Sequence, residues 1–206
     1  MRKRRERKML RQMASGETVE LTLLTGMRGL TRLAFLAEQF GYAYADLNES
    51  GGKMVLRLVP DPGPRARALA AENRARYPHA AEGGPLPPLA PEAIALLRAR
   101  MVLDLDRQHS RRQRLVIGAL LLALAAGELG TDFGKDTIEA LTIAGVSSLA
   151  LAALATVGFA VSRRLLVTYT ARLEAAGFTP VTDENGRKRY VPPGGQLPGH
   201  GNPFAR

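Results

Sequence analysis

Two long apolar stretches dominate the second half of the chain, from Leu115 to Gly127 and from Ala140 to Ser162. A membrane-spanning helix needs about 20 apolar residues to cross roughly 30 Å of hydrocarbon. The second stretch meets this length, and the first does so only if residues 128–133 reach into the opposite headgroup layer. The pattern predicts a transmembrane hairpin over residues 115–162, with spans of about 115–131 and 139–162.

The charges that flank these stretches predict the orientation of the hairpin. Arginines stand at its two outer ends, whereas the turn carries four acidic residues and one lysine. Lys and Arg near a span are retained on the cytoplasmic side. We therefore expect a multi-pass protein of the bacterial inner membrane with both termini in the cytoplasm. The predicted topology anchors are Arg111, Arg112, Arg114, Arg163 and Arg164.

Small residues recur at intervals of four along both stretches, which lets two helix backbones approach closely. This spacing predicts pairing of the helices, within one chain or between chains. The residues concerned are Ala119, Ala123, Gly127, Ala144, Ser148, Ala152 and Thr156. A soluble alanine-rich hairpin, buried in a helical bundle, is the alternative interpretation of the same stretches.

The first third of the chain has the pattern of a small mixed domain. Residues 19–23 alternate apolar and polar positions, which is typical of a half-buried strand, and residues 30–40 follow helical spacing up to Gly41. Two strands, 42–47 and 53–59, and a helix over 65–77 follow. The order β-α-β-β-α predicts a cytoplasmic α+β domain over residues 17–78. Its expected core is Leu21, Leu23, Leu33, Leu36, Phe40, Met54, Leu56 and Leu58.

The remaining segments are interpreted as connections and tails. Residues 79–91 are rich in Pro and Gly and predict a linker. Residues 92–114 predict a helical stalk that continues into the first span, although its narrow apolar seam could instead pack on the domain or lie on the membrane. Residues 163–192 predict a helix and a β-hairpin around Asn185-Gly186, and residues 193–206 a disordered tail.

Positive charge is concentrated at the N-terminus of a chain of 206 residues with a net charge of +10. Residues 1–16 predict a basic arm, in which Lys and Arg greatly outnumber the single acidic residue, Glu6. Such groups bind phosphates of lipids or of nucleic acid. The tip of the C-terminal hairpin, residues 187–189, is also basic; retention on the cytoplasmic side is its first interpretation, and contact with phosphates is the alternative. The candidate phosphate contacts are Arg2, Lys3, Arg4, Arg5, Arg7, Lys8, Arg11, Arg28, Arg65, Arg67, Arg74 and Arg76.

Residues typical of catalysis or cofactor binding are scarce in this sequence. It has no cysteine, and its three histidines show no spacing of metal ligands. We find no phosphate-binding P-loop, no dinucleotide fingerprint and no Ser-His-Asp set. We therefore expect no cofactor, no metal, no small-molecule substrate and no enzymatic activity.

The sequence thus predicts a non-catalytic, two-span inner-membrane protein. Its cytoplasmic domain and basic tails would recruit or organise a partner at the membrane, either another protein or a second copy paired through the spans. The alternative is a membrane-anchored accessory protein that binds nucleic acid, for example in DNA transfer or in a mobile element. An oligomeric pore is a third hypothesis, but the spans offer almost no polar lining.

Overall fold

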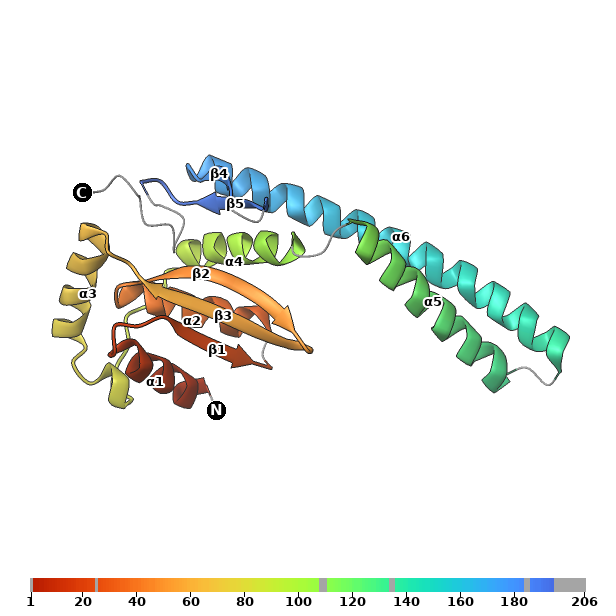
Figure 1. The fold of residues 1–206 in the computed structure, drawn as a ribbon, viewed down its shortest axis with the longest axis horizontal. Coiled ribbons are helices and arrows are strands. Elements are labelled where there is room, and N and C mark those ends of the chain that lie inside the picture. Colours follow the sequence, from red (N-terminus) through yellow and green to blue (C-terminus); the bar gives the residue numbers. More distant parts are fainter. Residues whose placement is uncertain (1, 25, 108–110, 134–135, 184–185, 195–206) are drawn as a thin grey trace. The chain divides into compact units, whose positions relative to one another are not determined.

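The chain forms two compact units in the computed structural model, which describes residues 2–24, 26–107, 111–133, 136–183 and 186–194 (Figure 1). The first unit joins residues 1–108 with residues 169–206, and we call it the discontinuous domain. The second comprises residues 109–168, and we call it the helical unit. The fold is mixed α+β with a small antiparallel sheet and a long apolar helix.

A three-stranded antiparallel sheet lies at the centre of the discontinuous domain. Its strands β1 (Val19–Leu23), β2 (Tyr42–Ser50) and β3 (Lys53–Pro60) are arranged in the order β1-β3-β2. Alternate positions of β1 are buried and exposed, as Val19 and Glu20 illustrate, because successive side chains of a strand point to opposite faces. The three predicted strands are confirmed.

Helices pack against the buried face of this sheet. The predicted helices are present as α2 (Met27–Gln39) and α3 (Pro64–Arg76), and α4 (Pro91–Asp106) packs on α2 and β2. Of the alternatives for the predicted stalk, packing of its apolar seam on the domain is the one observed, because Leu97 and Met101 of α4 are buried in the core. Helix α4 ends at Asp106, and its predicted continuation into the first span falls on residues 108–110, which lie outside the described part of the chain.

The basic N-terminal segment is also part of this domain. It forms helix α1 (Arg2–Met13), whose residues Met9, Leu10 and Met13 are buried in the core. The helix packs beside the short helix η1 (Ala80–Glu82), in the segment predicted as a linker. The interpretation of residues 1–16 as a separate arm is therefore wrong, because the surrounding charges obscure the apolar stripe at i, i+1 and i+4.

The buried core largely matches the prediction. Leu23 and Met54 are only partly buried against it. The predicted core residues that are buried are Leu21, Leu33, Leu36, Phe40, Leu56 and Leu58. The sequence pattern missed Tyr44, Leu47 and the contributions of α1 and α4, which are all buried.

The segment after the helical unit returns to the discontinuous domain. Helix α6 (Thr137–Ala175) runs past the apolar stretch, and Gly177, at a φ of 80°, follows its end. Strands β4 (Thr179–Thr182) and β5 (Lys188–Val191) then form an antiparallel pair, which confirms the predicted hairpin. Its turn residues 184–185, and residues 195–206 of the predicted tail, lie outside the described residues.

The helical unit contains α5 (Arg111–Phe133) and most of α6, which run in opposite directions (Figure 1). Among the residues that the structure describes, α6 alone is long and apolar enough to cross a membrane. The apolar part of α5 is shorter, from Gly118 to Leu129. The structure therefore supports one candidate span rather than the predicted pair.

A substitution in α1 tests whether this helix belongs to the folded core. Met9 is fully buried, so we expect Met9→Ala to lower the free energy of unfolding by about 2–5 kcal/mol. The exposed neighbour Lys8 is the matched control, and Lys8→Ala should change stability by less than about 0.5 kcal/mol. Urea unfolding of the full chain in detergent, followed by near-ultraviolet circular dichroism of its tyrosines, measures both. Equal stability of the two variants would show that α1 is an arm on which the fold does not depend.

Candidate functional site

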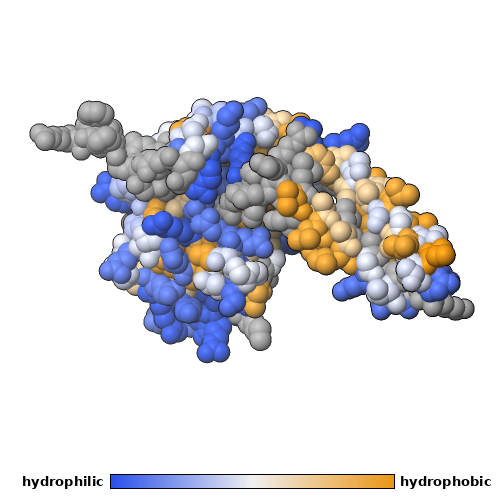
Figure 2. Space-filling view, turned by 45° about the vertical axis from the view of Figure 1, so that its right-hand side comes forward, coloured by the Kyte–Doolittle hydropathy of each residue, from blue (hydrophilic) through white to orange (hydrophobic). Residues whose placement is uncertain are grey.

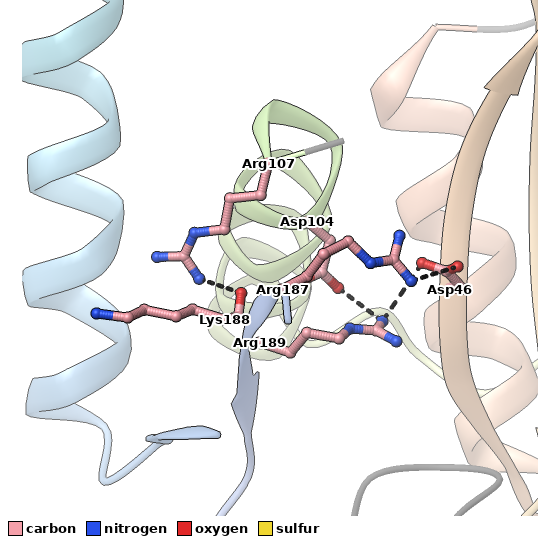
Figure 3. A pocket seen from close by; sticks show the side chains of 6 residues that line it. All are labelled: Asp46, Asp104, Arg107, Arg187, Lys188 and Arg189. Carbon is pink, nitrogen blue, oxygen red and sulfur yellow. Dashed lines mark hydrogen bonds and ion pairs between the residues drawn. The ribbon is translucent and has the colours of Figure 1, made fainter. Parts of the chain in front are cut away.

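A buried arginine connects the C-terminal hairpin to the N-terminal part of the chain. Arg189 of β5 is only 8% exposed, and its Nη2 lies 3.0 Å from Oδ2 of Asp104 in α4 (Figure 3). The same nitrogen donates a hydrogen bond to the carbonyl oxygen of Ala45 and lies 3.5 Å from Oδ1 of Asp46, both in β2. We call Arg189, Asp104, Ala45 and Asp46 the interlock. It ties together segments that are far apart in the sequence.

A β-bulge in β2 explains why a backbone carbonyl is available to Arg189. Tyr44 pairs with Leu58 and Asp46 pairs with Arg57, so Ala45 has no partner in the register. A bulged residue leaves the regular ladder and bends its strand. The carbonyl of Ala45 is thereby satisfied by a guanidinium group from a distant segment instead of by another strand.

The carboxylate of Asp104 is held from two sides. Besides Arg189, the hydroxyl of Tyr44 donates a hydrogen bond to its Oδ2 at 3.0 Å. Burial raises the pKa of Tyr44 well above its usual range, so the hydroxyl stays protonated as a donor. Burial disfavours the charged form of Arg189, but the adjacent Asp104 carboxylate outweighs this and raises the pKa of Arg189. The buried guanidinium of Arg189 is therefore kept charged by its neighbour.

Further contacts hold the hairpin on both sides of the interlock. Nε of Arg187 lies 3.0 Å from Oδ2 of Asp183 within the hairpin, and its Nη2 lies 3.7 Å from Oδ2 of Asp46. Arg107, which follows α4, donates a hydrogen bond to the carbonyl oxygen of Lys188. Its guanidinium carbon also lies 5.3 Å from the centre of the ring of Tyr190. The pocket that these side chains line leaves no room for a water molecule (Figure 3).

This geometry corrects one interpretation of the sequence. Contact with phosphates is the alternative interpretation of the hairpin residues 187–189, but Arg187 and Arg189 are engaged by carboxylates of the chain itself. Arg187 directly precedes β5, and no local sequence signal shows that Arg189 meets the carboxylates of Asp46 and Asp104, because these belong to distant segments. Only Lys188 of the three is exposed.

The cationic residues predicted to meet phosphates are gathered on α1. Its buried stripe fixes the helix, and Lys3, Arg4, Lys8 and Arg11 are exposed on the opposite side, with Arg5 and Arg7 half-buried. Figure 2 shows hydrophilic side chains over the lower edge of the domain, where Figure 1 places α1. The side chain of Arg2 lies outside the description.

The four arginines of α3 are exposed but do not form one surface. At 3.6 residues per turn, Arg65 and Arg76 lie on one side of the helix, whereas Arg67 and Arg74 lie on the other. Arg74 also donates a hydrogen bond to the carbonyl oxygen of Phe40, at 3.3 Å. Arg28, near the start of α2, is exposed on its own element. The structure thus gathers the predicted cations of α1 and separates the others.

Helix α6 presents its apolar surface without protein cover, since none of its most apolar 18-residue stretch is buried. The hydroxyl groups of Ser148 and Thr156 each donate to the carbonyl oxygen four residues earlier, at 2.8 Å. Such internal satisfaction is what hydrocarbon requires of polar side chains. At the end of the apolar stretch, Arg163 lies over the ring of Phe159, 6.0 Å from its centre, and Arg164 is exposed. The side chains of the predicted anchors Arg111, Arg112 and Arg114 lie outside the description.

The residues predicted to pair the helices are not buried between α5 and α6. A Cβ atom added at Gly127 would meet no atom within 4 Å. Ala119, Ala123, Ser148, Ala152 and Thr156 are exposed, and Ala144 is half-buried. Pairing through these positions stays a prediction, and it would concern another copy of the chain.

Similarity to other proteins gives no guidance to the function. No known protein family, curated protein or solved structure matches the chain. Within the described ranges, no three His, Cys, Asp or Glu side chains gather as a metal site. The function is therefore inferred from the interlock, the apolar helix α6 and the exposed cations of α1.

The first prediction for this site concerns the strength of the interlock. Arg189→Met removes the cation that is hydrogen-bonded to the buried Asp104 carboxylate and leaves the charge of Arg100 nearby, which should cost about 3 kcal/mol of hairpin docking. We expect limited proteolysis of the full chain to cut the segment after α6 much faster in this variant. Arg172→Met, which removes an exposed arginine from the last turn of α6, is the control and should leave cleavage unchanged. Unchanged cleavage of both variants would contradict the interlock.

The second prediction concerns pH. Burial raises the pKa of Glu38 from its ordinary 4.5 to about 7, while the Arg100 charge opposes this shift and Asp61 adds to it. Folding raises the pKa of Glu38, so the protonated carboxyl contributes fully to stability below about pH 4.5. This contribution is lost as the pH rises through about 7. Glu38→Gln should remove this loss, which amounts to at most about 3 kcal/mol.

Urea unfolding of the full chain in detergent at about pH 5 and about pH 8 measures this difference. The variant should gain stability over the unchanged protein mainly at the higher pH. Glu72→Gln, at an exposed position of α3, is the matched control and should show no such dependence. A gain that is the same at both pH values would contradict the raised pKa of Glu38.

Proposed function

We propose that the protein is a two-span membrane protein whose discontinuous domain recruits a partner on the cytoplasmic side, without catalysis of its own. The single observation that carries this proposal is the interlock. It places residues from before and after the helical unit in one folded body, through Arg189 and Asp104.

The connectivity of the chain means that a crossing of the membrane by α6 must be accompanied by a second crossing. Were α6 to cross the membrane alone, residues 169–194 would lie on the opposite side from residues 1–107. The contact between Arg189 and Asp104 could then not form. Crossing by α6 therefore requires a return crossing by α5. The apolar part of α5 is short, but local thinning of the bilayer accommodates such a mismatch at modest cost.

The charges support the cytoplasmic placement of the discontinuous domain. Arginines stand at the start of α5 and at the end of the apolar part of α6, whereas Glu128, Asp132, Asp136 and Glu139 lie around the connection between the helices. Retention of basic residues on the inner side favours this orientation. The exposed apolar surface of α6 supports contact with lipid.

Recruitment is the role that remains for a small domain with a charged surface. The sequence contains no motif of a nucleotide site or of nucleophilic catalysis. The domain does present fixed cations on α1. A folded, cationic domain held at a membrane is suited to binding an acidic or phosphate-bearing surface and to keeping it there.

Single cysteines test this topology, since the chain has no native cysteine. Ser50→Cys and Thr182→Cys place thiols at exposed positions on either side of the interlock, and Thr131→Cys places one near the end of α5. In spheroplasts, an impermeant maleimide should label only position 131, and labelling of 50 and 182 should require permeabilisation. Labelling of 50 and 182 from opposite sides would contradict the proposal, as would recovery of the chain in the soluble fraction.

A further inference from the structure

We infer that the cationic face of α1 is a second membrane contact, which binds anionic lipid headgroups of the leaflet next to the domain. By the cationic face we mean Lys3, Arg4, Lys8 and Arg11 together with the half-buried Arg7. This inference rests on the proposed membrane anchoring. It goes further by naming the ligand that one surface of the domain binds.

The geometry of α1 gives its positive charge a direction. At 3.6 residues per turn, the five residues of the cationic face occupy an arc of about 140°, and Met9 and Met13 lie across the helix from it. Those two side chains are buried in the core, so the helix cannot rotate away. The charges are therefore arranged before any ligand binds, which lowers the entropy lost on binding.

The face is not neutralised by acidic residues of its own helix. The one acidic residue of α1, Glu6, is only 3% exposed and lies 2.8 Å from Nε of Arg32, on the buried side. The acidic residue of the adjacent η1, Glu82, pairs with His79 at 3.0 Å. Arg7 and Arg11 contact backbone carbonyls, those of Lys3 and Ala81, and such contacts leave their charge in place.

Helix α3 does not share this arrangement. The arginines of α3 are split between two sides, and Glu72 lies on the side of Arg65 and Arg76. Arg67 and Arg74 line an open groove together with Asp61. Helix α3 thus carries similar numbers of cations without a common direction, which makes it a suitable internal control.

Headgroups are favoured over nucleic acid as the ligand. The cationic face carries no aromatic side chain on which a base could stack. A domain anchored at both ends of a helical unit stays close to a leaflet, so headgroup phosphates are present at high effective concentration. Each Lys or Arg near an anionic leaflet favours the bound state by about fivefold.

The test uses the full chain in lipid nanodiscs. A fluorophore on Gln12→Cys, an exposed position beside the cationic face, reports quenching by a spin label on the lipid headgroup. We expect strong quenching in nanodiscs with phosphatidylglycerol and weak quenching with phosphatidylcholine alone or at high salt. Changing Lys3, Arg4, Lys8 and Arg11 together to Gln should lower quenching in anionic nanodiscs to the neutral level.

The matched control removes four charges elsewhere on the same domain. Changing Lys53, Arg65, Arg67 and Arg76, all exposed, to Gln should leave the quenching high. Equal quenching in both variants would overturn the inference, because net charge alone would then explain the contact. Displacement of the quenching by duplex DNA at physiological salt would also overturn it in favour of nucleic acid.

The failure of this inference can be distinguished from failure of the anchoring. If the chain does not co-purify with nanodiscs, the proposed spans are wrong. If it co-purifies but Gln12→Cys is not quenched in anionic lipid, the spans stand and the headgroup contact is wrong. Equal thermal midpoints of the variants establish that the exposed substitutions have not unfolded the domain.

Discussion

The structure depends on one buried charge that must be compensated by a distant part of the chain. The Arg189 guanidinium lies between the Asp104 carboxylate and the carbonyl of Ala45, and neither acceptor belongs to its own hairpin. A buried ion pair adds little net stability, but an uncompensated buried charge is costly, so the pair selects one arrangement. That arrangement requires residues 1–107 and the segment after α6 to fold as one domain, although the whole helical unit separates them in the sequence.

This constraint determines how the helical unit can be used. Because its two ends belong to the same domain, the unit is an insertion and not a divider between two domains. An insertion can project into a bilayer only as an even number of crossings. The unburied apolar surface of α6 is the reason for proposing such a projection, and the cationic face of α1 is the inferred second contact with the bilayer. The proposed anchoring and the proposed recruitment thus both rest on one arrangement of the chain.

Local patterns predicted most of the sheet and its central helix, but not the contacts between distant segments. Alternation in β1 and helical spacing in α2 are short-range signals, and both elements form as expected. In α1 the density of Lys and Arg concealed three core residues, and in α4 the apolar seam had more than one possible partner. Arg189 could not be assigned from the sequence, because its partners belong to distant segments and a β-bulge exposes one of them.

Cross-linking across the interlock in native membranes tests the central claim most directly. A short bismaleimide would join Arg107→Cys and Lys188→Cys, whose parent residues are in contact, in a chain that carries a protease site inserted after Asp132. After cleavage, the account predicts that the two fragments of cross-linked protein migrate together on a denaturing gel, and that fragments of untreated protein separate. Fragments that separate despite efficient labelling of both thiols would show that the two segments do not meet, and would contradict the account.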